Sequence, residues 1–99
     1  MKTRKITIPN EYTNTLRGFV DWFNDEYEPT EKDHQVALKR LAEKLNKSGK
    51  SIRITDLEIW FLENYLQSAW QDDSCKVNKD DLHKLFNYVM EKDNEQTNQ

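Results

Sequence analysis

The sequence contains one cysteine, two glycines and two histidines, and this scarcity limits the chemistry it can support. Cys75, which its polar surroundings predict to be exposed, has no second cysteine for a disulfide bond within the chain. Gly18 and Gly49 cannot build a glycine-rich phosphate loop or a nucleophile elbow. His34 and His83 lack the spacing of zinc ligands. We therefore predict a non-catalytic protein that has no catalytic residues, no metal site and no cofactor.

Long apolar runs are also absent. No segment approaches the ~18 apolar residues that read as a membrane-spanning helix. The first nine residues carry positive charges, but the apolar run of a secretory signal does not follow them. We therefore expect a cytoplasmic protein that does not bind membranes.

Neither sign of charge dominates, since 15 Lys and Arg residues stand against 18 Asp and Glu residues, for a net charge of -3. This balance is unlike the strong positive field of a general phosphate binder. Lysine and asparagine are abundant, a bias that we associate with an AT-rich gene of bacterial, phage or mobile-element origin. The net charge therefore does not indicate which class of partner the protein binds.

What the sequence does contain is helical periodicity. Apolar residues recur at spacings of three and four in four stretches, at residues 11–27, 30–47, 56–71 and 78–92. The third stretch is apolar on nearly all sides, which predicts a central position for its helix. The predicted fold class is mainly α, with one small four-helix domain over residues 1–92.

The two ends of the chain differ from these helical stretches. Residues 1–9 are predicted to form an extended arm or a short strand, because isoleucines alternate with polar residues there. A similar alternation at residues 51–54 suggests that this segment pairs with residues 4–8 as a short two-stranded β ribbon. Residues 93–99 contain no apolar side chain, so we predict a disordered polar tail.

The stretch 70–86, WQDDSCKVNKDDLHKLF, looks at first like half of a calcium-binding helix-loop-helix. Such a loop needs oxygen ligands at its first, third and fifth positions and glycine at its sixth. A register that begins at Asp72 instead puts Lys76 fifth and Val77 sixth, and the other registers also fail at essential positions. We interpret the stretch as a connector between helices, in which Asn78 caps the last helix.

An acidic aromatic segment at residues 21–33 is the first candidate interaction site. It interleaves aromatic rings with acids, a composition that can place a ring in a partner's pocket and acids against a basic rim. The candidate partner-binding residues are Trp22, Asp25, Glu26, Tyr27 and Glu28. Trp22 could equally belong to the core. We hypothesise that the protein is a small accessory or inhibitor-like module that docks a protein partner.

A basic segment at residues 39–53 supports the alternative of a nucleic-acid-binding regulator. Its six cations are Lys39, Arg40, Lys44, Lys47, Lys50 and Arg53. A helix-turn-helix is disfavoured, because the connection over residues 48–54 exceeds the usual turn and the following helix begins with acids. The same cations can also be the solvated face of a helix. A homodimer, with aromatic residues in its interface, stays open.

Overall fold

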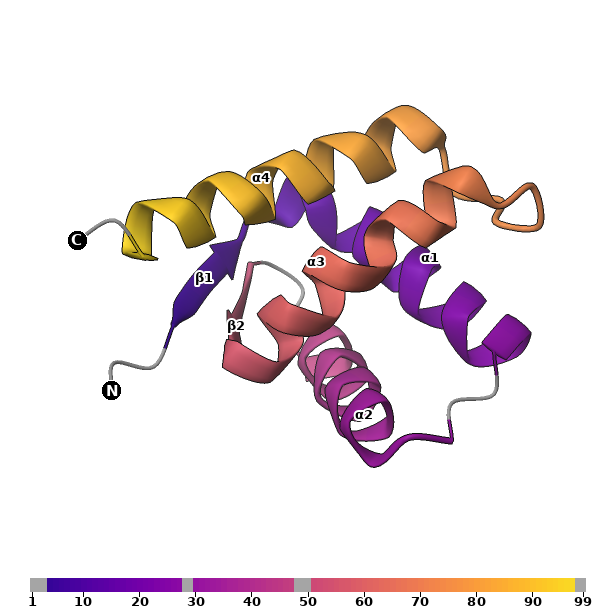
Figure 1. Cartoon of the computed structure of the whole chain (residues 1–99), viewed down its shortest axis with the longest axis horizontal. Helices are drawn as coiled ribbons and strands as arrows, with labels where there is room; N and C mark the ends of the chain where they lie inside the picture. The colour runs from indigo at the N-terminus through magenta and orange to yellow at the C-terminus, as the bar shows by residue number, and fades with distance from the viewer. Residues whose placement is uncertain (1–3, 28–29, 48–50, 98–99) are drawn as a thin grey trace.

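The computed structural model describes residues 4–27, 30–47 and 51–97 (Figure 1). These residues form four helices and a two-stranded sheet. The elements are β1 (Lys5–Ile8), α1 (Asn10–Tyr27), α2 (Lys32–Lys47), β2 (Ile52–Thr55), α3 (Asp56–Gln71) and α4 (Lys79–Thr97). The prediction of a mainly helical small fold with a short ribbon is confirmed.

The ribbon joins segments that are far apart in the sequence. β1 and β2 run antiparallel, with Ile6 opposite Ile54 and Ile8 opposite Ile52. All four isoleucines are buried, whereas Arg53 on the other face is exposed. A two-stranded ribbon is only marginally stable by itself. The isoleucines therefore stabilise it by packing into the helical core, of which they form part.

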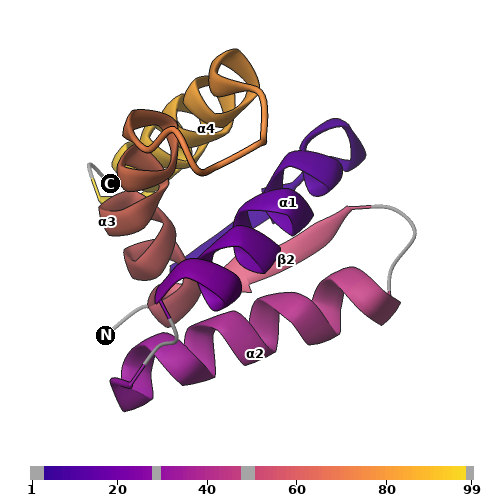
Figure 2. The same ribbon diagram turned by 90° about the vertical axis from the view of Figure 1, so that its right-hand side faces the viewer.

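Helices α1 and α2 lie side by side and antiparallel on one side of the molecule (Figure 2). Each buries one stripe of apolar residues, as the spacing predicts. The buried apolar residues are Leu16, Phe19, Val20, Trp22 and Phe23 in α1 and Ala37, Leu38, Leu41 and Leu45 in α2. The Arg17 guanidinium also donates a hydrogen bond of 2.9 Å to the carbonyl of Leu45, which links the middle of α1 to the end of α2.

Helix α3 has the central position that its sequence predicts, because it contacts the other three helices and β2. It buries Ile59, Phe61, Leu62, Leu66 and Ala69. Its first turn is held by a capping box, in which the Glu58 carboxylate accepts a hydrogen bond of 2.9 Å from the backbone N–H of Thr55. This cap places the start of α3 directly after β2.

The predicted disordered tail is wrong for the residues that the structure describes, because α4 continues to Thr97. Asp93 is buried, and Gln96 bonds to the edge of β1. Its amide oxygen accepts from the backbone N–H of Lys5 at 2.9 Å, and its amide nitrogen donates to the Lys5 carbonyl at 2.6 Å. A segment without apolar residues is thus ordered by polar contacts to a distant strand. Residues 98 and 99 lie outside the described residues.

The connector between α3 and α4 packs closely against α1. A Cβ atom at Gly18 would lie 2.6 Å from Cγ2 of Val77, so only glycine fits there without a shift. The backbone N–H of Asp81 donates to the side chain of Asn78 at 3.1 Å, as the predicted cap requires. Cys75, which was predicted to be exposed, is instead buried, because the connector turns its side chain toward the core.

Candidate functional site

Aromatic rings gather where the end of α1, the start of α2 and the first half of α3 meet. His34 lies among them, with its ring centroid 5.7 Å from that of Trp60 in a stacked arrangement and 4.8 Å from that of Tyr65. Phe23 contacts Tyr27 at 4.8 Å and Tyr65 at 5.4 Å between centroids. We call the outer part of this cluster, made of Tyr27, His34, Trp60 and Tyr65, the aromatic surface.

The structure separates the predicted partner-binding residues. Trp22 is 7% exposed, and its indole N–H donates to the Ser74 hydroxyl at 2.9 Å, so its ring belongs to the core. Asp25 and Glu26 are exposed at the end of α1, and Tyr27 is 48% exposed. Glu28 lies outside the described residues. Of the two aromatic candidates, therefore, only Tyr27 is available to a partner.

Trp60 is the functional candidate that the sequence did not distinguish. It is 36% exposed, and with Tyr27 it forms the pair of large hydrophobic side chains that the described surface leaves open. Its neighbours Ile59 and Phe61 are fully buried. Helix α3 is apolar on nearly all sides, and three neighbouring helices do not cover every side of it. The sequence therefore indicated that some apolar residue of this helix is exposed. Periodicity alone does not tell which ring remains outside.

A cavity of about 260 Å³ opens beside the aromatic surface. It is lined by Phe23, Tyr27, Thr30, Glu31, His34, Tyr65 and Ser68. At its edge, Nε2 of His34 lies 2.9 Å from the Tyr65 hydroxyl and 3.5 Å from the Glu31 carboxylate. Burial raises the pKa of the Tyr27 phenol, and the nearby carboxylates of Asp72 and Glu26 raise it further. The cavity is thus formed mainly by aromatic rings, with the Glu31 carboxylate in its lining and the Asp72 carboxylate near the Tyr27 hydroxyl.

The basic segment is only partly available. Lys39, Arg40, Lys47 and Arg53 are exposed, and no ion-pair partner faces them among the described residues. Lys44 instead places its ammonium group 2.7 Å from the carboxylate of Glu58, a residue that is fully buried. Lys50 lies outside the described residues. One of the six predicted cations is therefore committed to the fold.

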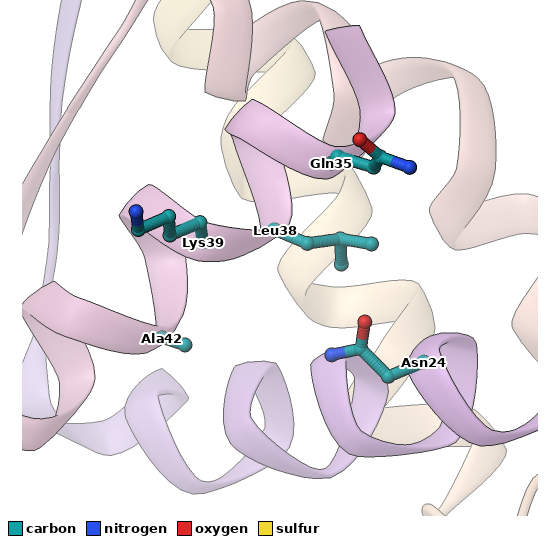
Figure 3. Close-up of a pocket in the computed structure, with 5 residues that line it drawn as sticks. All are labelled: Asn24, Gln35, Leu38, Lys39 and Ala42. Carbon is teal, nitrogen blue, oxygen red and sulfur yellow. The ribbon is translucent and has the colours of Figure 1, made fainter. Parts of the chain in front are cut away.

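A second cavity, of about 250 Å³, lies between α1 and α2 (Figure 3). It is lined by Asn24, Gln35, Leu38, Lys39 and Ala42. Asn24 approaches it from α1, and the other four residues come from α2. Its polar groups are amides and one ammonium. This set lacks the carboxylate or imidazole that general acid–base catalysis most often uses.

In the connector between α3 and α4, which resembles half a calcium loop, backbone carbonyls accept hydrogen bonds from a lysine side chain. The Lys79 ammonium donates to the carbonyls of Ala69, Asp72 and Cys75 at 2.9, 2.6 and 3.3 Å. The Asp72 carboxylate accepts from the backbone N–H of Ser74 at 2.9 Å, and this hydrogen bond lowers its pKa. In the described part of the chain, no three His, Cys, Asp or Glu residues come together as a metal site.

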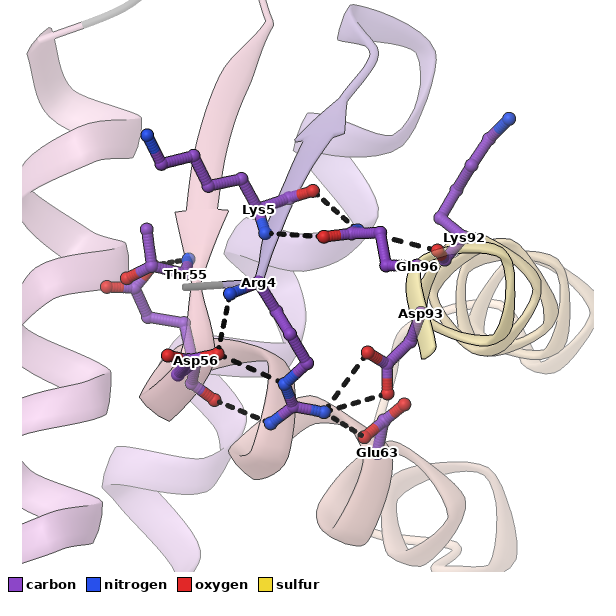
Figure 4. A network of polar contacts seen from close by, with 9 residues as sticks. Arg4, Lys5, Thr55, Asp56, Glu63, Lys92, Asp93 and Gln96 are labelled. Carbon is purple, nitrogen blue, oxygen red and sulfur yellow. Dashed lines mark hydrogen bonds and ion pairs between the residues drawn. The ribbon is translucent and has the colours of Figure 1, made fainter. Parts of the chain in front are cut away.

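A network of charges, which we call the Arg4 clasp, joins the start of β1 to α3 and α4 (Figure 4). Arg4 donates from Nε to Asp56 at 3.1 Å and from Nη1 to Asp93 at 2.9 Å, and Nη1 lies 3.9 Å from Glu63. The hydrogen bonds from the backbone and side chain of Arg4 lower the pKa of Asp56. The clasp thus gathers three carboxylates around one guanidinium.

Glu63 is the unusual member of the clasp. Burial, a hydrogen bond with Asp93 and the charge of that carboxylate raise the pKa of Glu63 to about 7, against the opposing charge of Arg4. A raised carboxyl pKa can mark a catalytic acid. Here the carboxyl group faces the other members of the clasp, and the same shift is expected of a structural carboxylate pair.

Comparisons with known proteins add no assignment, because no family model, no curated protein and no solved structure is significantly similar to the chain. Within the described residues, no helix is both long enough and apolar enough to cross a membrane.

Proposed function

We propose that the protein is a small, non-catalytic, cytoplasmic interaction module of an accessory or inhibitor-like kind, which docks a protein partner on its aromatic surface. The observation that carries the proposal is the position of the two exposed large hydrophobic side chains. Tyr27 and Trp60 come from different helices, yet both border the His34 cluster. Aromatic side chains of this kind dominate the energetic centres of protein interfaces.

The rings of the aromatic surface are arranged for binding before any partner arrives. Trp60 stacks on His34, and Tyr27 packs edge-on to Trp22 at 5.2 Å between centroids. These contacts restrict the side-chain rotamers in the free protein. Less conformational entropy is then lost on association, which favours binding at a given buried area.

The charge around the aromatic surface indicates the chemistry of the partner. Asp25 and Glu26 are exposed next to Tyr27, and Glu31 is exposed at the start of α2. Carboxylates around an apolar centre attract a basic partner and guide its orientation during encounter. We infer that the partner presents a basic segment with an apolar contact.

The proposal is tested by affinity capture from the native host with matched variants. Tyr27→Ser and Trp60→Gln are each expected to reduce recovery of the partner at least tenfold. The charge reversal Asp25→Lys/Glu26→Lys should reduce it less, and more strongly at low salt. The control Asp80→Lys/Glu91→Lys, which makes the same charge change on α4, should retain the partner. Equal recovery with all variants would contradict the proposal.

A nucleic-acid-binding regulator is the alternative, and it is favoured by the four exposed cations of the basic segment that have no ion-pair partner within the described part of the chain. Binding to random duplex DNA should then weaken steeply with salt. Lys39→Gln/Lys47→Gln should lower the slope of log K against log salt by about 2, because each lost phosphate contact lowers it by about 1. Absence of binding at low salt would rule this function out.

A further inference from the structure

We propose that the cavity between Tyr27 and Tyr65 is a binding site for one arginine side chain of the partner. This inference rests on the proposed docking function and deepens it, because it names the group that the aromatic surface recognises. The cavity of about 260 Å³ lies between the end of α1, the start of α2 and the middle of α3. Three features of its lining favour arginine.

The first feature is the set of aromatic walls. Phe23, Tyr27 and Tyr65 all line the cavity, and their rings are tilted or edge-on to one another. A planar guanidinium group binds to ring faces by stacking and by cation–π attraction. The ring positions are fixed by contact with one another and with Phe61 in the core. The walls are therefore present before an arginine enters.

The second feature is the charge at the rim. Glu31 lines the cavity and its side chain is 72% exposed, so its carboxylate can reach an incoming cation. The Asp72 carboxylate interacts with the Tyr27 hydroxyl, through a hydrogen bond and through its charge. None of the seven lining residues is a lysine or an arginine. The charge of Lys79 acts on Asp72, but its ammonium group donates to the backbone carbonyls of Ala69, Asp72 and Cys75. A guanidinium fork matches a carboxylate better than an ammonium group does.

The third feature is a difference from the neighbouring cavity. That cavity, of about 360 Å³, is lined by Gly18, Trp22, Asp25, Glu26, Ser74, Lys76 and Val77. It also has acids, but Lys76 adds a positive charge and Trp22 is the only ring in its lining. The cavity beside Tyr65 has four rings in its lining, counting the imidazole of His34, and no lysine or arginine. The neighbouring cavity thus provides an internal control within the same protein.

The test uses the full chain and three small probes, N-acetyl-arginine methylamide, its lysine analogue and its citrulline analogue. Citrulline has the shape of arginine without the charge. We expect NMR titration to show the arginine probe binding at least fivefold more tightly than either other probe, with shifts at the Tyr65 and His34 side chains. Equal binding of citrulline would overturn the cation site, and equal binding of lysine would overturn the assignment to arginine.

Variants locate the site. Glu31→Gln, at an exposed position that the core does not use, should weaken the arginine probe at least threefold. Tyr65→Leu should weaken it more, and its folding is checked independently by circular dichroism. Lys76→Gln, at an exposed position in the neighbouring cavity, should leave the affinity unchanged. If Lys76→Gln changed the affinity for the arginine probe as much as Glu31→Gln does, the probe would be bound in the neighbouring cavity, and the proposed site would be wrong.

The outcomes also separate this inference from the docking proposal. Should Tyr27→Ser and Trp60→Gln lose the partner while the protein shows no preference for arginine, docking holds and the arginine site is wrong. Should arginine bind selectively while these two variants retain the partner, the arginine site holds and the proposed docking surface is wrong.

Discussion

The Arg4 clasp and the aromatic surface lie on different parts of the molecule and differ in the exposure of their charged side chains. In the clasp, three carboxylates surround one guanidinium, and the Asp93 side chain is only 10% exposed. At the aromatic surface, the Glu31 side chain is 72% exposed and two large rings reach the solvent. Groups that find partners within the fold stabilise it, whereas groups that remain open are available for binding.

The same contrast divides the basic segment. Lys44 pairs with the buried Glu58, while Lys47, one turn further along α2, is exposed. Both lysines look alike in the sequence, and both were candidates for nucleic-acid contact. Their environments predict different consequences of substitution, which allows the comparison to be tested.

The largest effect is expected from Lys44→Met. It removes the cation opposite a fully buried carboxylate, whose other oxygen, Oε1, has no hydrogen-bond partner among the described residues. Breaking one side of a buried ion pair leaves an uncompensated charge, so the free energy of unfolding should fall by about 3 kcal/mol. Urea denaturation measures it. Lys47→Met is the matched control, and it should change the free energy of unfolding by no more than about 0.5 kcal/mol. Equal losses in the two variants would show that Lys44 is no more important for the fold than Lys47.

The next effect is expected from Arg4→Met, which leaves the clasp carboxylates without their cation. Because Arg4 is partly exposed, water compensates in part, and we expect a loss of about 2 kcal/mol in urea denaturation. Arg53→Met, on the exposed face of the same ribbon, should change stability by less than about 0.5 kcal/mol. A neutral Arg4→Met variant would show that the clasp does not stabilise the fold.

A smaller effect is expected when Glu63 titrates. Its pKa is raised from 4.5 to about 7, so the folded protein holds a proton there that the unfolded chain releases above pH 4.5. Its contribution to stability is therefore complete below pH 4.5 and is lost as the pH rises to about 7. Glu63→Gln cannot titrate, and it should flatten the slope of stability against pH in this window. An unchanged slope would contradict the assignment.

The smallest effect on stability is expected from Tyr27→Ser, because the ring is already 48% exposed. We expect a loss below about 1 kcal/mol, while partner binding falls at least tenfold. Chemical denaturation and affinity capture on the same preparation check both quantities. If Tyr27→Ser lost much stability but kept its partner, Tyr27 would be a residue that stabilises the fold, and it would not belong to the binding surface.

The sequence predicted the elements of this fold better than their long-range contacts. Helical spacing and alternating isoleucines are local patterns, and they located the helices and the ribbon. The pairs Arg4–Asp93 and Lys44–Glu58 join residues whose proximity no local pattern encodes. For this reason the segment after residue 92 was predicted to be a disordered tail.

The candidate site was predicted only in part for the same reason. Helical periodicity placed Trp22 beside an apolar stripe, but the connector that covers it, with Ser74 bound to its indole, lies 52 residues away. Trp60 belongs to a helix whose apolar residues point in all directions, so its exposure depends on where the other helices end. Asp25, Glu26 and Tyr27 are exposed because they close α1, beyond its buried stripe, although the spacing of Tyr27 also fits the apolar face of that helix.

The link between β1 and the last turns of α4 sets an order of events during translation. The backbone of Lys5 bonds to Gln96, 91 residues later, and Arg4 bonds to Asp93. On the ribosome, β1 is made first but cannot gain these contacts until the end of α4 has emerged from the exit tunnel. β1 thus lacks its contacts with α4 until the chain has grown by the 91 residues that separate Lys5 from Gln96, and this is the interval in which a chaperone or a neighbouring nascent chain has access to the edge of the strand.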